Sequence, residues 1–197
     1  ESGRLWVASS TGDQVTRIEP GTGQQESVTF EAGSQPLAVL TTPDAVYVTL
    51  SGSDQLARID PESLQYDLLA VSDRPAFLAV GGDSLWVVDD GGWVDRVDPT
   101  TFTVTATIEV AGAKGIAIVR DLAWVTAGSS DELVEIDLFT NEVIGRFPVG
   151  VGPDAIAVDG NAVWVANRGA GTVVRFDTVY KEVTDEVATG TAPSGLA

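Results

Sequence analysis

The chain has 197 residues, of which 44% are hydrophobic, with 21 Gly and 9 Pro. This composition predicts one packed, turn-rich domain and excludes a disordered chain. The formal net charge of −18 would repel nucleic acid and anionic membranes, and no apolar run is long enough to cross a bilayer. We therefore expect no nucleic-acid partner and no membrane insertion by this segment. Because Cys is absent, disulfides and thiolate metal sites are excluded as well.

The acidity has two interpretations that the sequence leaves open. A strongly negative surface keeps a protein soluble, also in a salty habitat. The same surface would attract a cationic ligand or a basic partner.

A segment of about 40 residues recurs five times along the chain. Each copy carries one aromatic residue in a short apolar stretch, at Trp6, Tyr47, Trp86, Trp124 and Trp164. Each copy also carries one acidic residue further on, at Glu19, Asp60, Asp98, Asp137 and Asp177. The spacings within both series are 38 to 41 residues, so two independent landmarks keep one period.

Within a copy, four short strands are expected in chain order. In the third copy they are the apolar stretch Leu78–Val80, the aromatic and β-branched stretch 85–88, the alternating stretch Val94–Asp98 and the alternating stretch Thr103–Val110. The acid that ends the third strand opens a turn, because its side chain can accept bonds from the following backbone. Four strands in about 40 residues is the size of a propeller blade. The sequence thus predicts an all-β fold, a β-propeller of five four-stranded antiparallel blades, in a single domain 1–197.

The two ends of the chain complement each other. Residues 191–197 read as the first strand of a copy, whereas residues 1–9 read as a second strand. One blade shared between the N- and C-termini would close the ring and remove two exposed strand edges. A fragment of a larger propeller or a longer protein, cut at a repeat boundary, would show the same join.

The copies resemble the YVTN-type and NHL-type propeller repeats of bacterial proteins, including virginiamycin B lyase-like ones. The resemblance rests on "P-x-x-[LI]-A" starts at Pro75, Pro153 and Pro193, on "[VL]-W-V" strands, and on "R-[IV]-[DE]" strand ends such as Arg96–Asp98. It covers the whole chain and implies the propeller fold. It implies little about function, because such repeats serve enzymes, sensors and scaffolds alike.

The residues favour binding over catalysis. The lyase-like relatives imply a catalytic histidine, and this sequence contains no His. The alternative is a carboxylate- or divalent-metal-dependent hydrolase or lyase at the channel mouth. A ring of oxygen ligands there would hold Ca²⁺ or Mg²⁺, although we expect no cofactor. The repeated acids such as Asp60 and Asp98 are expected to cap turns and to pair with the nearby Arg.

Candidate binding residues are sought where the copies differ. Five residues before each strand-end acid, four copies have a polar residue and the third has Trp93. The pattern predicts an exposed indole beside Asp89 and Asp90, whose alternative role is to cover the gap left by Gly91 and Gly92. The predicted ligand- or partner-binding set comes from the loops between second and third strands and between blades, and it comprises Trp93, Asp89, Asp90, Asn167, Arg168, Arg74 and Asp154.

Together these features predict a non-enzymatic binding or scaffold propeller. Its loop face is expected to recognise a protein, a peptide or a sugar, in an extracytoplasmic setting (periplasmic, secreted or cell-surface).

Overall fold

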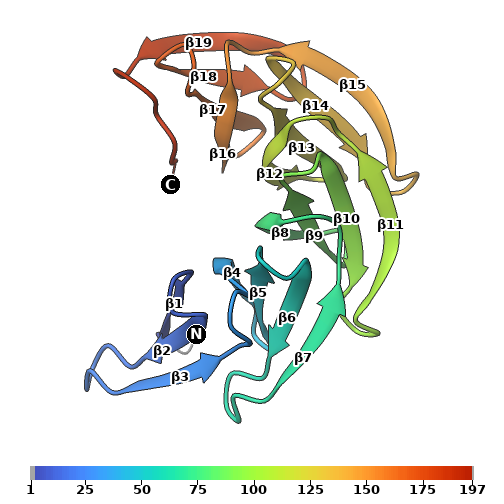
Figure 1. Cartoon of the computed structure of the whole chain (residues 1–197). Helices are drawn as coiled ribbons and strands as arrows, with labels where there is room; N and C mark the ends of the chain where they lie inside the picture. Colours follow the sequence, from blue (N-terminus) through green and yellow to red (C-terminus); the bar gives the residue numbers. More distant parts are fainter. Residues whose placement is uncertain (1–2, 197) are drawn as a thin grey trace. The chain divides into compact units, whose positions relative to one another are not determined.

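The computed structural model describes residues 3–196, which form β-strands, turns and connecting loops (Figure 1). The chain divides into two compact units, Glu1–Leu78 and Ala79–Ala197. None of the described residues forms a helix, so none forms a helix long and apolar enough to cross a membrane. The expectation of an all-β fold is confirmed.

The first unit contains two antiparallel sheets whose strands follow one another in chain order. The first sheet is formed by β1 (Leu5–Ser9), β2 (Gln14–Ile18) and β3 (Gln25–Thr29). The second sheet is formed by β4 (Pro36–Thr41), β5 (Val46–Leu50), β6 (Gln55–Ile59) and β7 (Tyr66–Ala70). A core of apolar side chains from both sheets, including Val15, Val48 and Ile59, holds the unit together.

Three four-stranded sheets follow, and the boundary between the units falls inside the first strand of the first of them. This sheet comprises β8 (Pro75–Gly81), β9 (Ser84–Asp89), β10 (Trp93–Asp98) and β11 (Thr103–Glu109). The next comprises β12 (Ala113–Val119), β13 (Leu122–Ala127), β14 (Glu132–Asp137) and β15 (Glu142–Pro148). The last comprises β16 (Pro153–Asp159), β17 (Ala162–Asn167), β18 (Thr172–Asp177) and β19 (Glu182–Ala188).

The predicted four-stranded antiparallel repeat is therefore confirmed in four of the five copies. The first sheet has three strands, and residues 189–196, which include the expected closing segment, form no strand. The predicted join also involves residues 1–2 and 197, which lie outside the described residues. Closure of a ring through a shared blade stays a prediction.

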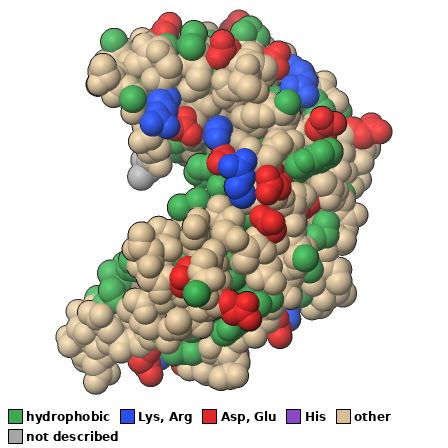
Figure 2. All heavy atoms as spheres, viewed as in Figure 1, with side chains coloured by type: hydrophobic (Ala, Val, Ile, Leu, Met, Phe, Trp, Pro, Cys, Tyr) green, Lys and Arg blue, Asp and Glu red, His purple; other side chains and the backbone are tan. Residues whose placement is uncertain are grey.

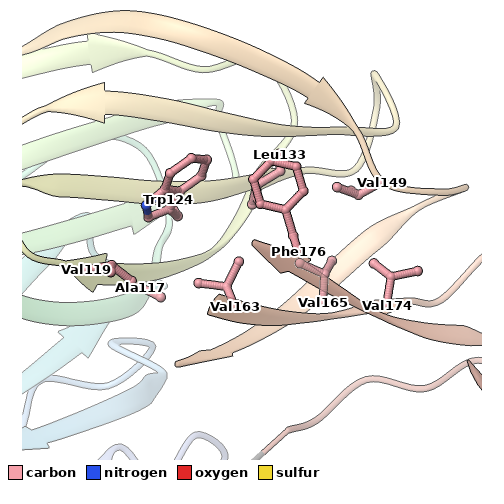
Figure 3. Close-up of a cluster of buried hydrophobic side chains, with 9 residues drawn as sticks. All are labelled: Ala117, Val119, Trp124, Leu133, Val149, Val163, Val165, Val174 and Phe176. Atoms are coloured by element: carbon pink, nitrogen blue, oxygen red, sulfur yellow. The ribbon is translucent and has the colours of Figure 1, made fainter. Parts of the chain in front are cut away.

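The sheets of the second unit pack on each other through large apolar side chains. Trp124 and Leu133 of one sheet meet Val163, Val165 and Phe176 of the next (Figure 3). The ring centroids of Trp124 and Phe176 are 5.4 Å apart, and both side chains are almost completely buried. Burying an aromatic side chain of this size removes 150–250 Å² from water, so such contacts dominate the stability of the repeat.

In four of the five copies the acid that ends the third strand holds the following turn, as expected, whereas Glu19 of the first copy accepts a hydrogen bond from Arg4 at 2.6 Å. The carboxylates of Asp60, Asp98, Asp137 and Asp177 each accept two backbone N–H groups from the residues two and three positions on. These backbone hydrogen bonds lower the pKa of all four carboxyls below the usual range of Asp. These four acids cap turns. The expected pairing of Asp60 and Asp98 with the nearby Arg is not found within residues 3–196, because Arg58 pairs with Asp67 and Arg96 donates to the Leu138 carbonyl.

Candidate functional site

One end of the sheets in the second unit carries the loops that vary most between copies. The loops between second and third strands lie against the loops between consecutive sheets. Three backbone hydrogen bonds of 2.8 Å connect them, from Val110 N–H to the Gly92 carbonyl, from Gly128 N–H to the Gly112 carbonyl and from Arg168 N–H to the Gly152 carbonyl. We call this surface, formed by residues 89–93, 110–115, 127–131, 149–154 and 167–171, the loop face.

The loop between β9 and β10 has an unusual composition for this repeat. The residue before the third strand has a left-handed backbone in every copy. It is Asp13, Asp54 or Asp131 in three copies and Gly in two, Gly92 (φ of 96°) and Gly171. In the three copies with Asp, the carboxylate accepts backbone N–H groups of the following inter-sheet loop, as Asp131 does from Gly152 at 2.8 Å. Gly92 has no carboxylate, so this loop depends on Asp89 for its side-chain hydrogen bond.

Asp89 holds the loop from inside the protein. Its Oδ1 accepts the backbone N–H of Trp93 at 2.9 Å, while the Oδ2 is buried without a hydrogen-bond partner. The residue is only 2% exposed, and burial raises the pKa of its carboxyl above the usual range of Asp. Asp89 was predicted as a contact residue, but the structure places it beneath the surface because its carboxylate ties the loop down.

Trp93 begins β10 and is 37% exposed, in agreement with the predicted exposed indole. In the sheet it is paired with Glu109 of β11. Residues opposite each other in an antiparallel pair project from the same face of the sheet. The exposed indole and the exposed Glu109 carboxylate are therefore neighbours.

Charged side chains continue the loop face next to this loop (Figure 2). Asp90, exposed, forms an ion pair with Lys114, and Arg168 lies 3.9 Å from Asp154 (Nη1 to Oδ2). Lys114 and Asp154 occupy equivalent places in irregular stretches of β12 and β16, where the register with the neighbouring strand shifts. Such bulges turn a side chain away from the regular alternation of the strand.

Two other predicted residues lie elsewhere. Asn167 is completely buried and donates from Nδ2 to the Val149 carbonyl at 2.7 Å, so it anchors the last inter-sheet loop instead of facing solvent. Arg74 belongs to the first unit, where its backbone N–H donates to Asp54 and its exposed guanidinium to Asp73 at 3.3 Å. The structure thus brings together Trp93, Asp89 and Asp90 on one loop, and Arg168 with Asp154.

Sequence reasoning missed three exposed features. Glu109 was not identified because it lies 16 positions after Trp93 in the sequence and is its neighbour only through the pairing of β10 with β11. Phe139 and Tyr180 are 79% and 76% exposed at the tips of the turns after β14 and β18. An alignment of the turns would have found these two. The first three copies have Gly21, Glu62 and Thr100 at the position of Phe139, and Thr22, Ser63 and Thr101 at the position of Tyr180.

The first unit contains an open hollow of about 620 Å³ lined by Arg4, Trp6, Thr42, Pro43 and Glu62 among others. Arg4 donates to Glu19 at 2.6 Å and to Glu62 at 2.5 Å, which raises the pKa of the guanidinium and lowers that of Glu62. One guanidinium thus pairs with two carboxylates, so this cluster carries one net negative charge at the edge of the hollow.

The described residues contain no group of three or more carboxylates placed to hold a metal ion. Binding of Ca²⁺ or Mg²⁺ at the channel mouth stays a prediction.

No protein-family model matches the sequence, and no curated protein matches it. Solved structures do match its fold. A catalytically inactive histidine-to-alanine variant of virginiamycin B lyase from Staphylococcus aureus, solved with quinupristin, aligns with 100% of this chain at a TM-score of 0.86 and 18% identity. A chain of a mitotic checkpoint complex aligns with 97% at 0.86 and 13% identity, and BamB from Moraxella catarrhalis with 96% at 0.72 and 16% identity.

The chain spans 71%, 63% and 62% of the lengths of these three proteins, respectively. The predicted likeness to propeller repeats, including those of virginiamycin B lyase, is confirmed at the level of the fold. Since lyases and members of protein assemblies share this fold, it does not decide between catalysis and binding.

Proposed function

We propose that the chain is a non-enzymatic binding or scaffold propeller whose loop face recognises a protein or peptide partner, or a sugar. The observation that carries the proposal is Trp93, an indole 37% exposed on a loop that Asp89 fixes from below. Exposed aromatic side chains held in one position are the usual anchors of protein interfaces, and their flat rings also stack on sugars.

The surroundings of Trp93 support recognition more than chemistry. Asp90, Lys114, Arg168 and Asp154 are joined in pairs, and each pair carries no net charge. Such pairs give a surface specificity and orientation when a partner approaches.

The alternative is a carboxylate- or divalent-metal-dependent hydrolase or lyase. The observation in its favour is the fold shared with virginiamycin B lyase. Replacement of a histidine accompanies loss of activity in the variant of that enzyme, and these 197 residues include no histidine. We therefore favour binding over catalysis for this chain.

The finer architecture belongs to the same proposal. A ring of five blades, with one blade shared between the ends, would supply a fourth strand to the three-stranded first sheet. An extracytoplasmic setting also stays a prediction.

The experiment is a binding screen of the chain against arrays of neutral, acidic and basic peptides and of glycans, in parallel with Trp93→Ala. We expect ligands whose affinity drops about tenfold or more in the variant, the usual scale for an aromatic anchor. Trp93→Phe, which keeps a ring, serves as the control for folding and is expected to retain part of the affinity. If Trp93→Ala leaves every affinity unchanged, the proposal is wrong.

A further inference from the structure

Inside the second unit, the tryptophans that lie between sheets are each covered by a cation. The guanidinium carbon of Arg96 lies 5.2 Å from the ring centroid of Trp86, and Nζ of Lys181 lies 4.5 Å from that of Trp124. A cation over an indole is attracted by the negative face of the ring. In both cases oxygen acceptors beside the ring hold the cation, the Leu138 carbonyl for Arg96 and the Glu135 carboxylate for Lys181.

Trp93 has the acceptors without the cation. Glu109, opposite it in the sheet, is exposed, and its carboxylate makes no hydrogen bond or ion pair with the side chains of residues 3–196. Asp95, two positions along the same strand, points to the same face and accepts a hydrogen bond from Thr107 at 2.5 Å. No Arg or Lys of residues 3–196 stacks on Trp93.

Asp89 adds a second sign of an incomplete site. It is 2% exposed, and its Oδ2 has no partner among the described residues. A buried carboxylate oxygen is normally paired, because leaving it without a donor is costly. Of the acidic residues bonded to Trp93 or paired with it in the sheet, Glu109 and Asp89 therefore have acceptor oxygens without a donor among residues 3–196.

We propose that Trp93 receives a lysine or arginine side chain from a basic segment of a partner protein, with Glu109 as its counter-charge. This inference rests on the proposed function and specifies the partner of the same surface. The net charge of −18 supports a protein segment as the source, since the field of the whole chain would steer a segment with several positive charges. Asp90 is already paired with Lys114, whereas the exposed carboxylate of Glu109 has no ion-pair partner among residues 3–196.

The test uses a synthetic Gly-Ser peptide that carries three arginines and a matched peptide in which citrulline, equal in shape but uncharged, replaces them. Calorimetric titration is expected to show binding of the arginine peptide and a loss of about tenfold or more with citrulline. Trp93→Ala and Glu109→Gln are each expected to weaken the arginine peptide. Glu186→Gln removes the same charge from an exposed strand position far along the chain and is expected to change little.

Three outcomes would overturn the inference. They are equal binding of the citrulline peptide, binding of the arginine peptide that neither Trp93→Ala nor Glu109→Gln weakens, and binding of tetramethylammonium as tight as that of the peptide. If the inference fails while neutral peptides or glycans still bind in a Trp93-dependent way, the proposed function stands with another ligand. If no ligand of any class depends on Trp93, both fail.

Discussion

At the scale of single residues, Asp89 fixes a loop although burying its carboxylate lowers the stability of the fold. It bonds the Trp93 backbone with one carboxylate oxygen and leaves the other buried and unpaired. Burial raises the pKa of its carboxyl. As the pH rises from the usual range of Asp through this raised pKa, the unfolded chain has already lost the proton that the folded chain still holds, so the contribution of Asp89 to stability falls.

Asp89→Asn removes the buried charge and keeps an oxygen for the Trp93 N–H. We expect the variant to be more stable than the original chain at pH 7 by about 1 kcal/mol, the lower end of the cost of an unpaired buried polar group. The gain is expected to shrink as the pH falls through the raised pKa, where Asp89 becomes neutral. Thermal unfolding followed from pH 4 to pH 8 would show this trend, with exposed Asp159→Asn as the control. A variant that is less stable at every pH would contradict the assignment.

At the scale of elements, the same link between sheets occurs with two different charge patterns. Arg96 donates to the carbonyl of Leu138 at 2.6 Å and to Asn141 at 3.0 Å in the next sheet's turn. One sheet later, Glu135 takes the position of the arginine and Lys181 that of Asn141, and the two form an ion pair. Both pairs of sheets are linked at the same positions of the repeat. The positive charge is on the third strand in one (Arg96) and in the turn of the following sheet in the other (Lys181).

This equivalence predicts a rescue. Lys181→Asn leaves the Glu135 carboxylate, 5% exposed, without its cation, and we expect a loss of about 2 kcal/mol. This is below the range for a fully buried pair because the Lys181 side chain is 32% exposed. Adding Glu135→Arg recreates the Arg96–Asn141 pattern and should recover most of the loss in urea unfolding. A double variant no more stable than Lys181→Asn alone would show that the two links are not equivalent.

The repeat could be predicted from the sequence because its signals are local. The strand-end acids, the aromatic anchors and the strand alternation each depend on a few neighbouring residues, and the four-stranded sheets follow from them. The accessibility of Asp89 and Asn167 could not be predicted, since it depends on which backbone groups the folded loops bring to these side chains. The closeness of Glu109 to Trp93 depends on strand register, which the sequence fixes less directly.

At the scale of the whole molecule, five similar copies provide the scaffold, and positions at which one copy departs from the repeat distinguish one part of the surface from another. The chain spans 62–71% of the lengths of the compared proteins that share its fold. The net charge of −18 is common to the whole chain, whereas the exposed indole of Trp93 belongs to one copy. Binding that depends on Trp93 would therefore separate a specific site from the general effect of the acidic surface.

The most direct measurement is fluorine NMR of the chain with its five tryptophans replaced by 5-fluorotryptophan, titrated with the tightest ligand from the peptide and glycan screen. The Trp93 signal, assigned by its loss in Trp93→Phe, is expected to shift first and furthest, while the signals of the buried Trp86 and Trp124 stay in place. A ligand that binds while the Trp93 signal does not move, and that shifts Trp6 in the hollow of the first unit instead, would contradict the assignment of the loop face as the binding surface.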